Sequence, residues 1–118
     1  MAETTFVDKP WGHELIWART DRYVGKILHV KAGESLSLQY HEQKDETIMV
    51  LSGEMELEHY LEGEPPHKTV LAPRQPFHIT PGMRHRMVAI SDTDIVEVST
   101  TELDDVVRLE DRYGRAPG

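Results

Sequence analysis

The stretch that decides the fold is Gly33-Glu-Ser-Leu-Ser-Leu-Gln-Tyr-His-Glu-Gln-Lys-Asp-Glu-Thr-Ile-Met-Val-Leu-Ser-Gly53. Apolar and polar residues alternate up to His41, which places Gln39 and His41 on one face of an expected strand. The polar residues 42–45 suit a short loop, and a β-rich run led by Glu46 is expected to form the next strand. A hairpin at this loop would return Glu46 to His41. The stretch therefore predicts that an amide, an imidazole and a carboxylate converge from two adjacent strands, as ligands of a divalent metal.

The same alternation gives the first expected strand two faces of different character. The polar face also carries Ser35 and Ser37, and the opposite face carries Leu36, Leu38 and Tyr40. Buried polar groups without partners are costly, so the polar face either opens as a pocket or is satisfied by a metal and its ligands. The apolar face must be covered by a second sheet or by a second subunit, and we expect a homodimer.

A second stretch of interest is Phe77-His-Ile-Thr-Pro-Gly-Met-Arg-His-Arg-Met-Val88. Pro81 and Gly82 form a turn signal, and His85 begins the strand expected after the turn. A turn at this point can swing His85 inward. His85 is therefore the candidate for the fourth ligand.

The two stretches resemble the two sequence motifs of the cupin family. The first motif matches in the spacing of Gly33, Gln39, His41, Glu46 and Gly53, and the second matches in residues 81–85. The chain departs from the usual motifs at two positions: Gln39 replaces a His, and Thr80 replaces a Pro two residues before the Gly.

The cupin resemblance implies an all-β fold, a single small barrel of the double-stranded β-helix or jelly-roll type. It also implies that Gln39, His41, Glu46 and His85 bind one divalent metal ion inside this barrel. Imidazole, carboxylate and amide oxygen are borderline-to-hard ligands, which suit Zn, Mn, Fe, Ni or Co and do not suit Cu(I). The cupin resemblance also favours a homodimer.

Further stretches narrow the resemblance to the C-terminal cupin domain of type II mannose-6-phosphate isomerases, which are often fused to a mannose-1-phosphate guanylyltransferase. These stretches are residues 9–12, 36–41, 95–98 and 104–115. Gln39 is normal in that family. The chain departs from the usual sequence of that family at two places. Lys44-Asp-Glu-Thr-Ile48 stands where the family has Arg-Ala-Glu-His-Trp, and Ala89 stands where the family has Asn.

This narrower resemblance implies an enzyme that interconverts mannose 6-phosphate and fructose 6-phosphate. The metal would act as a Lewis acid, and Glu46 is the candidate for the base that moves a proton. Lys44 and Arg84, which are close in sequence to the ligands, are the candidate phosphate contacts. The alternative is a metal-binding cupin of another role, either an oxygen-dependent oxidase or dioxygenase on a small organic molecule or a carbohydrate-binding module, because one fold hosts many chemistries.

Composition limits the other classes of function. The formal net charge of −8 argues against a nucleic-acid partner, which would require a basic face. The chain has no cysteine, so disulfides and thiolate metal sites are excluded. Its apolar runs are far too short to cross a membrane, and its first residues do not resemble a signal peptide, so we expect a cytoplasmic protein that acts on a small molecule.

Short β-rich runs broken by Gly and Pro follow one another along the whole chain, as is typical of a barrel or sandwich. The expected strands are residues 11–17, 23–30, 35–41, 46–51, 54–61, 68–71, 77–79, 86–90 and 94–99. Residues 103–109 are expected to form a short terminal helix. The charged tail at 104–115 either closes the barrel edge or pairs with another subunit, and residues 1–118 are expected to form a single domain.

Overall fold

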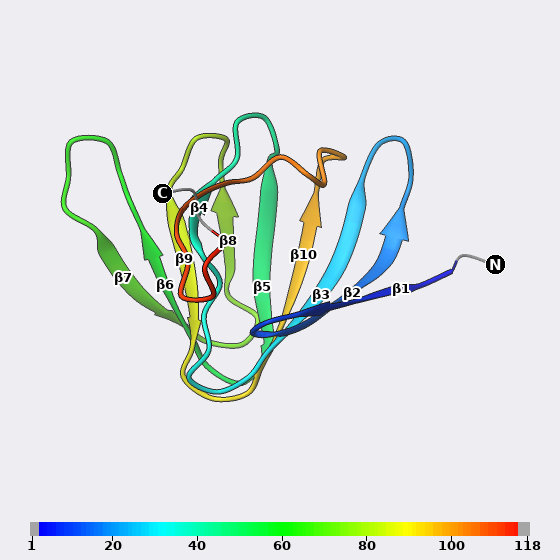
Figure 1. The fold of residues 1–118 in the computed structure, drawn as a ribbon, viewed down its shortest axis with the longest axis horizontal. Coiled ribbons are helices and arrows are strands. Elements are labelled where there is room, and N and C mark those ends of the chain that lie inside the picture. Colours follow the sequence, from blue (N-terminus) through cyan, green and yellow to red (C-terminus); the bar gives the residue numbers. More distant parts are fainter. Residues whose placement is uncertain (1–2, 116–118) are drawn as a thin grey trace.

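A computed structural model describes residues 3–115, which form two antiparallel sheets (Figure 1). The strands of the six-stranded sheet are, in spatial order, β1 (Thr5–Lys9), β2 (Gly12–Arg19), β3 (Val24–Val30), β10 (Thr93–Ser99), β5 (Glu46–Ser52) and β8 (Pro76–Ile79). Those of the five-stranded sheet are β11 (Val107–Glu110), β4 (Leu38–Tyr40), β9 (His85–Ala89), β6 (Met55–His59) and β7 (His67–Leu71). The all-β barrel expected from the sequence is confirmed.

The core lies between the two sheets because each central strand alternates in burial. In β5 the side chains of Ile48 and Val50 are fully buried, and in β10 the same is true of Ile95. The five-stranded sheet contributes Met55 and Leu57 from β6 to the same apolar cluster. These strands are aliphatic toward the barrel centre.

The expectation of a terminal helix at 103–109 is wrong, because Val107–Glu110 form strand β11 on the edge of β4. Two physical reasons favour the strand. Val106 and Val107 are β-branched, and β4 would otherwise present an unpaired edge. The tail therefore closes the barrel edge within its own chain. None of the residues from 3 to 115 belongs to a helix that could cross a membrane.

The predicted hairpin between residues 35–41 and 46–51 is also wrong. β4 belongs to the five-stranded sheet and β5 to the six-stranded sheet, so the intervening loop crosses from one sheet to the other. Asp105 holds this loop, because its carboxylate accepts hydrogen bonds from the backbone N–H groups of Glu42, Gln43 and Lys44 at 2.7–3.0 Å. His41 and Glu46 therefore face each other across the barrel.

The predicted two-faced strand before His41 is shorter than expected. Regular pairing covers only Leu38–Tyr40, and the residues before it pair at the single bridge of Ser35 with Val88. The alternation does not hold through the irregular part, and Leu36 packs against the core on the same side as Gln39. The leucines at 36 and 38 are thus covered within the chain.

A candidate metal centre

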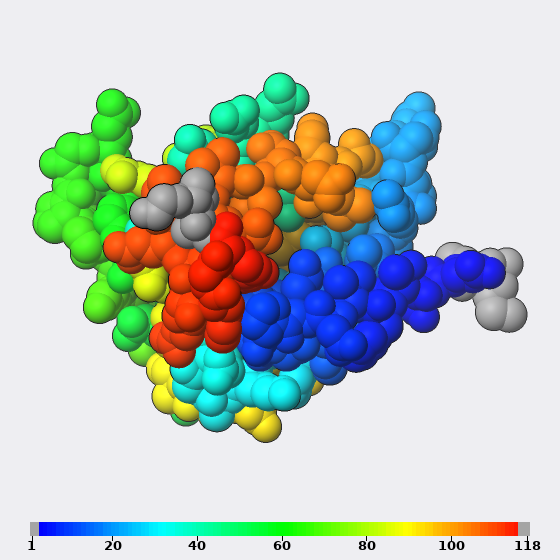
Figure 2. Space-filling model, viewed as in Figure 1, coloured from blue at the N-terminus to red at the C-terminus, as the bar shows by residue number. Residues whose placement is uncertain are grey.

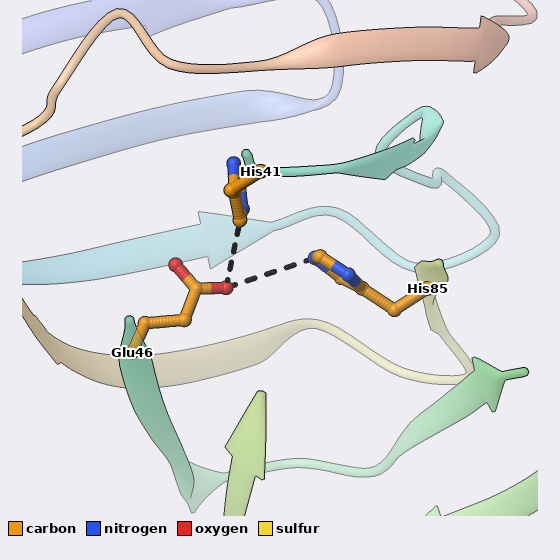
Figure 3. A group of neighbouring side chains, drawn as sticks. All are labelled: His41, Glu46 and His85. Atoms are coloured by element: carbon orange, nitrogen blue, oxygen red, sulfur yellow. Dashed lines mark ion pairs between the residues drawn. The ribbon is translucent and has the colours of Figure 1, made fainter. Parts of the chain in front are cut away.

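Three side chains converge at one end of the barrel (Figure 3). His41 directly follows β4, Glu46 begins β5 and His85 begins β9. The Nε2 atoms of His41 and His85 lie 3.5 Å and 3.6 Å from the same carboxylate oxygen, Glu46 Oε1. All three residues are at most 3% exposed. The structure thus brings together three of the four ligands expected from the sequence.

Backbone carbonyl groups fix the orientation of both imidazoles. His41 Nδ1 lies 2.6 Å from the carbonyl oxygen of Asp105, and His85 Nδ1 lies 2.9 Å from that of Met83. A carbonyl oxygen only accepts, so each Nδ1 carries the hydrogen and each Nε2 keeps its lone pair. Within residues 3–115 neither Nε2 atom has a hydrogen-bond partner, although both are buried. Two buried lone pairs aimed at one carboxylate fit a divalent cation, and outer carbonyl partners are usual for ligating histidines.

The protonation states of these groups also suit a cation. Burial raises the pKa of Glu46, but the neighbouring polar groups, the Lys44 cation among them, outweigh this and hold the pKa at about 2. Burial lowers the pKa of His85 and so favours the neutral imidazole that a metal requires. The site therefore offers one carboxylate and two imidazoles as ligands.

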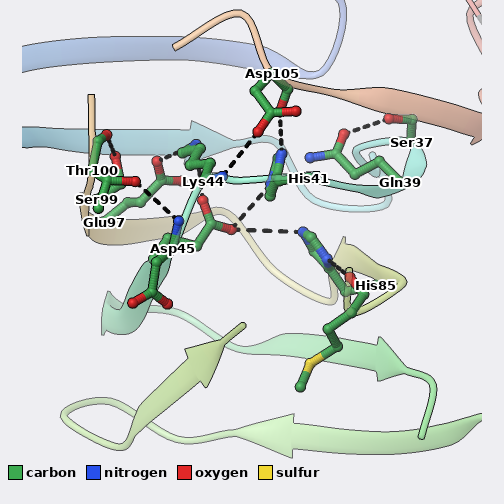
Figure 4. Close-up of polar contacts among 12 residues, drawn as sticks. Ser37, Gln39, His41, Lys44, Asp45, His85, Glu97, Ser99, Thr100 and Asp105 are labelled. Carbon is green, nitrogen blue, oxygen red and sulfur yellow. Dashed lines mark hydrogen bonds and ion pairs between the residues drawn. The ribbon is translucent and has the colours of Figure 1, made fainter. Parts of the chain in front are cut away.

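Gln39, the expected fourth ligand, lies beside this group. It pairs in register with His85 across β4 and β9, so the two side chains share the inner face of the sheet. Its Oε1 accepts a hydrogen bond from Ser37 Oγ at 2.6 Å, and its amide nitrogen points toward His41 (Figure 4). A half-turn of the amide would exchange these roles, with the nitrogen donating to Ser37 Oγ and the oxygen facing the site. Coordination by Gln39 stays a prediction.

Two of the converging side chains, His41 and Glu46, and the adjacent Gln39 line a cavity of about 380 Å³. Its mouth lies where the first strands and the C-terminal segment approach each other, and Figure 2 shows a hollow between them. Lys44, predicted as a phosphate contact, lines this cavity but is bound at 2.9 Å to Glu46 Oε2 and at 3.0 Å to Glu97 Oε2. Arg84, the other predicted contact, is exposed over the ring of Tyr60 and does not line the cavity.

Sequence reasoning missed the buried ionic network behind the metal ligands. Glu97 and Lys26 point inward from neighbouring positions of β10 and β3, and Lys26 Nζ lies 3.4 Å from Glu14 Oε1. Burial lowers the pKa of Lys44, yet the adjacent carboxylates of Glu97 and Glu46 outweigh this and raise it above its usual value. A signal was present: Glu97 occupies the same face of its strand as Ile95, where an aliphatic residue is expected.

Residues 26–101 match the family described as Cupin domain. Mannose-1-phosphate guanylyltransferase ManC of Salmonella typhimurium is 35% identical over 114 residues, which cover 92% of this chain and 23% of that protein. Xanthan biosynthesis protein XanB of Xanthomonas campestris is 33% identical over the same length, again 23% of that protein. The chain thus spans less than a quarter of the length of these relatives.

Solved structures with a similar fold include KdgF from Halomonas sp., with a TM-score of 0.73 and 24% identity over 85% of this chain and 90% of that one. Capsular polysaccharide assembling protein CapF from Staphylococcus aureus has a TM-score of 0.76 and 19% identity, over 94% of this chain and 35% of its own. Oxalate decarboxylase from Bacillus subtilis has a TM-score of 0.78 and 12% identity, over 98% of this chain and 32% of its own. At these identities the likeness is one of fold.

Proposed function

This chain belongs to the cupin domain family, and from that premise we propose that it is a metal-dependent isomerase that interconverts the sugar phosphates mannose 6-phosphate and fructose 6-phosphate. The observation that carries the proposal is the convergence of His41, Glu46 and His85 beside one cavity, which His41 and Glu46 line, with both free Nε2 atoms buried. The likeness to guanylyltransferases of mannose 1-phosphate supports a substrate from the same sugar series.

His41, Glu46, His85 and Gln39 would hold one divalent ion, for which Zn, Mn, Fe, Ni and Co suit the donor set. When bound, such an ion supplies a Lewis acid that polarises a carbonyl oxygen. The protein fixes its own ligands in advance, because the carbonyl groups of Asp105 and Met83 orient the two imidazoles. A cavity of about 380 Å³ has room for a small sugar derivative beside this group.

Aldose–ketose isomerisation also requires a base that moves a proton between two adjacent carbons. Glu46 Oε2 is paired with Lys44, and Glu46 Oε1 faces the two Nε2 atoms as a metal ligand, which makes Glu46 a poor base. Glu97 lines the same cavity, and its ion pair with Lys44 uses only Oε2. Burial and the charge of Glu46 raise the pKa of Glu97, as suits a base that works near neutral pH. We therefore assign the base to Glu97.

Replacing Glu97 by Gln tests this assignment. Loss of a general base lowers rates by about 10²–10⁴-fold, so we expect Glu97→Gln to reduce kcat by at least about 100-fold with little change in KM. The assay is NMR-detected conversion of mannose 6-phosphate by protein loaded with Mn²⁺, with metal content measured on the same samples. Glu62→Gln, in an exposed loop, is the control. No conversion by the wild type, combined with bound iron and oxygen consumption, would instead favour the oxidase alternative.

We also propose a homodimer, formed through the outer face of the six-stranded sheet. The leucines of residues 36–38 are covered within the chain and do not provide this surface. On β2 and β10, however, Trp17 and Val98 are 42% and 49% exposed, and the Trp17 ring packs over Gly25, which pairs in register with Val98. An aromatic and an aliphatic side chain side by side on an open sheet are typical of a contact surface.

Val98→Lys places a charge in the middle of this surface and is expected to convert the dimer to a monomer, as measured by light scattering. Val70→Lys is the matched control, because Val70 is 51% exposed but lies on β7 in the other sheet. A wild-type protein that is monomeric at all concentrations would contradict the dimer. So would a Val98→Lys variant that stays dimeric.

A further inference from the structure

The lining of the cavity has an excess of positive charge, although the chain as a whole is negatively charged. The formal net charge of the chain is −8, yet more basic than acidic side chains line the cavity. The basic ones are Lys9, Arg19, Lys26, Lys44, Arg108 and Arg115, against four acidic ones. A divalent ion at the metal centre would add to this excess. A concave, positively charged surface on an acidic protein selects an anionic ligand.

The basic side chains differ in whether they already have an ion-pair partner within the protein. Lys44 is paired with a buried carboxylate, Lys26 is paired with the partly buried Glu14, and Arg115 Nε lies 2.9 Å from Asp111 Oδ2. Arg108 has no ion-pair partner within residues 3–115, and its Nε is buried there without a hydrogen-bond partner. A buried, unpartnered guanidinium nitrogen is costly unless a ligand satisfies it.

Strand pairing places Arg108 in line with the metal ligands. Arg108 on β11 pairs in register with Gln39 on β4, and Gln39 pairs with His85 on β9. Residues paired across antiparallel strands share a face, so all three side chains point into the barrel. Neighbouring strands are about 4.8 Å apart, so the backbone of Arg108 lies roughly 10 Å from that of His85. Lys9 and Arg19 lie in β1 and β2, on the other sheet.

We infer that Arg108 is a specificity-determining residue that binds the phosphate monoester group of the substrate, at the opposite end from the atoms that face the metal centre. This rests on the proposed function, since it names the residue that would recognise the phosphate of the same substrate. A guanidinium fork binds two phosphate oxygens at once, and at neutral pH a phosphate monoester carries a charge of about −1.5 to −2. A doubly charged group suits the excess of positive charge in the cavity better than a single carboxylate does.

The first test uses inorganic phosphate and metal-free protein, so that it does not depend on catalysis. Titration followed by NMR should show saturable binding, with the largest shift at the Arg108 Nε–H signal and a much weaker response to acetate. Arg108→Gln should weaken phosphate binding about tenfold to a hundredfold, the usual effect of losing hydrogen bonds between charged groups. Arg84→Gln is the matched control, because Arg84 is exposed outside the cavity. The wild-type titration gives an answer even if the Arg108 variant does not fold.

The inference is overturned if the Arg108 signal does not respond to phosphate, if acetate binds equally well, or if Arg84→Gln rather than Arg108→Gln abolishes binding. A second test uses Mn²⁺-loaded protein and mannose 6-phosphate. Arg108→Gln should bind as much metal as the wild type and raise KM at least tenfold, and Arg108→Lys should recover part of the loss. If Arg108 binds phosphate but the wild type does not convert the sugar phosphate, the isomerase proposal fails and the phosphate site stands.

Discussion

His41→Ala and His85→Ala are each expected to abolish the metal binding, and with it the isomerase activity, that we propose for this protein. Both imidazoles present an unpartnered Nε2 to Glu46 Oε1, and the ligand atoms of the three residues lie close enough together to hold one metal ion. Loss of an outer-shell partner alone lowers metal affinity about 10–100-fold, so loss of a ligand should exceed 100-fold. Elemental analysis of the purified variants, after loading with Mn²⁺ or Zn²⁺, measures this directly.

Thermal unfolding gives a second measure of the same prediction. A metal present at a thousand times its Kd adds about 4.1 kcal/mol to the free energy of unfolding of the protein that binds it. The wild type and His67→Ala, whose imidazole is on the surface, should show this gain, and the two site variants should not. Equal stabilisation of His85→Ala would mean that the metal binds elsewhere. A wild type that takes up no metal would remove the catalytic proposal altogether.

The sequence was sufficient to predict the candidate ligands because their signals are local. Alternation around Gln39 and His41, a turn before His85 and a β-rich run after Glu46 place four polar side chains at strand ends, and His41, Glu46 and His85 meet there in the structure. The hairpin was wrong even so. The sequence does not decide whether the second strand pairs with the first in one sheet or crosses to the other sheet, because the polar loop 42–45 fits both arrangements. The crossing depends on Asp105, more than 60 positions away in the chain.

Long-range contacts also account for what the sequence did not show. The strand at Val107–Glu110 forms because β4 has a free edge, which is a property of the assembled sheet. The N-terminal strand at Thr5–Lys9 was missed for the same reason, since among residues 3–115 its one partner is β2 at the sheet edge. Charged residues are also ambiguous in a sequence: Lys44 looks like a surface cation in a polar loop, yet it is 4% exposed.

Lys44→Met is expected to cause the largest loss of stability among single substitutions of charged residues in this protein. Lys44 Nζ lies between two carboxylates, at 2.9 Å from Glu46 Oε2 and 3.0 Å from Glu97 Oε2, and all three side chains are nearly inaccessible to solvent. Removing one member of a buried ionic cluster costs about 3–5 kcal/mol, because the remaining charges lose their partner. Here two like charges would remain near each other. Chemical denaturation in the presence of a chelator measures the loss without any contribution from metal.

A second variant separates the ion pair from the loss of a long side chain. Lys44→Met/Glu97→Leu removes one of the two stranded carboxylates, so the double variant should be more stable than Lys44→Met alone, with a coupling energy of about 1–3 kcal/mol. Lys68→Met, at an exposed position of β7, is the control for the substitution itself and should change stability by less than about 0.5 kcal/mol. A cost below about 1 kcal/mol for Lys44→Met would equal that of a surface pair. It would mean that Glu46 and Glu97 do not depend on Lys44 for their charge, and that the cation is not part of what keeps the Glu46 ligand ionised inside the barrel.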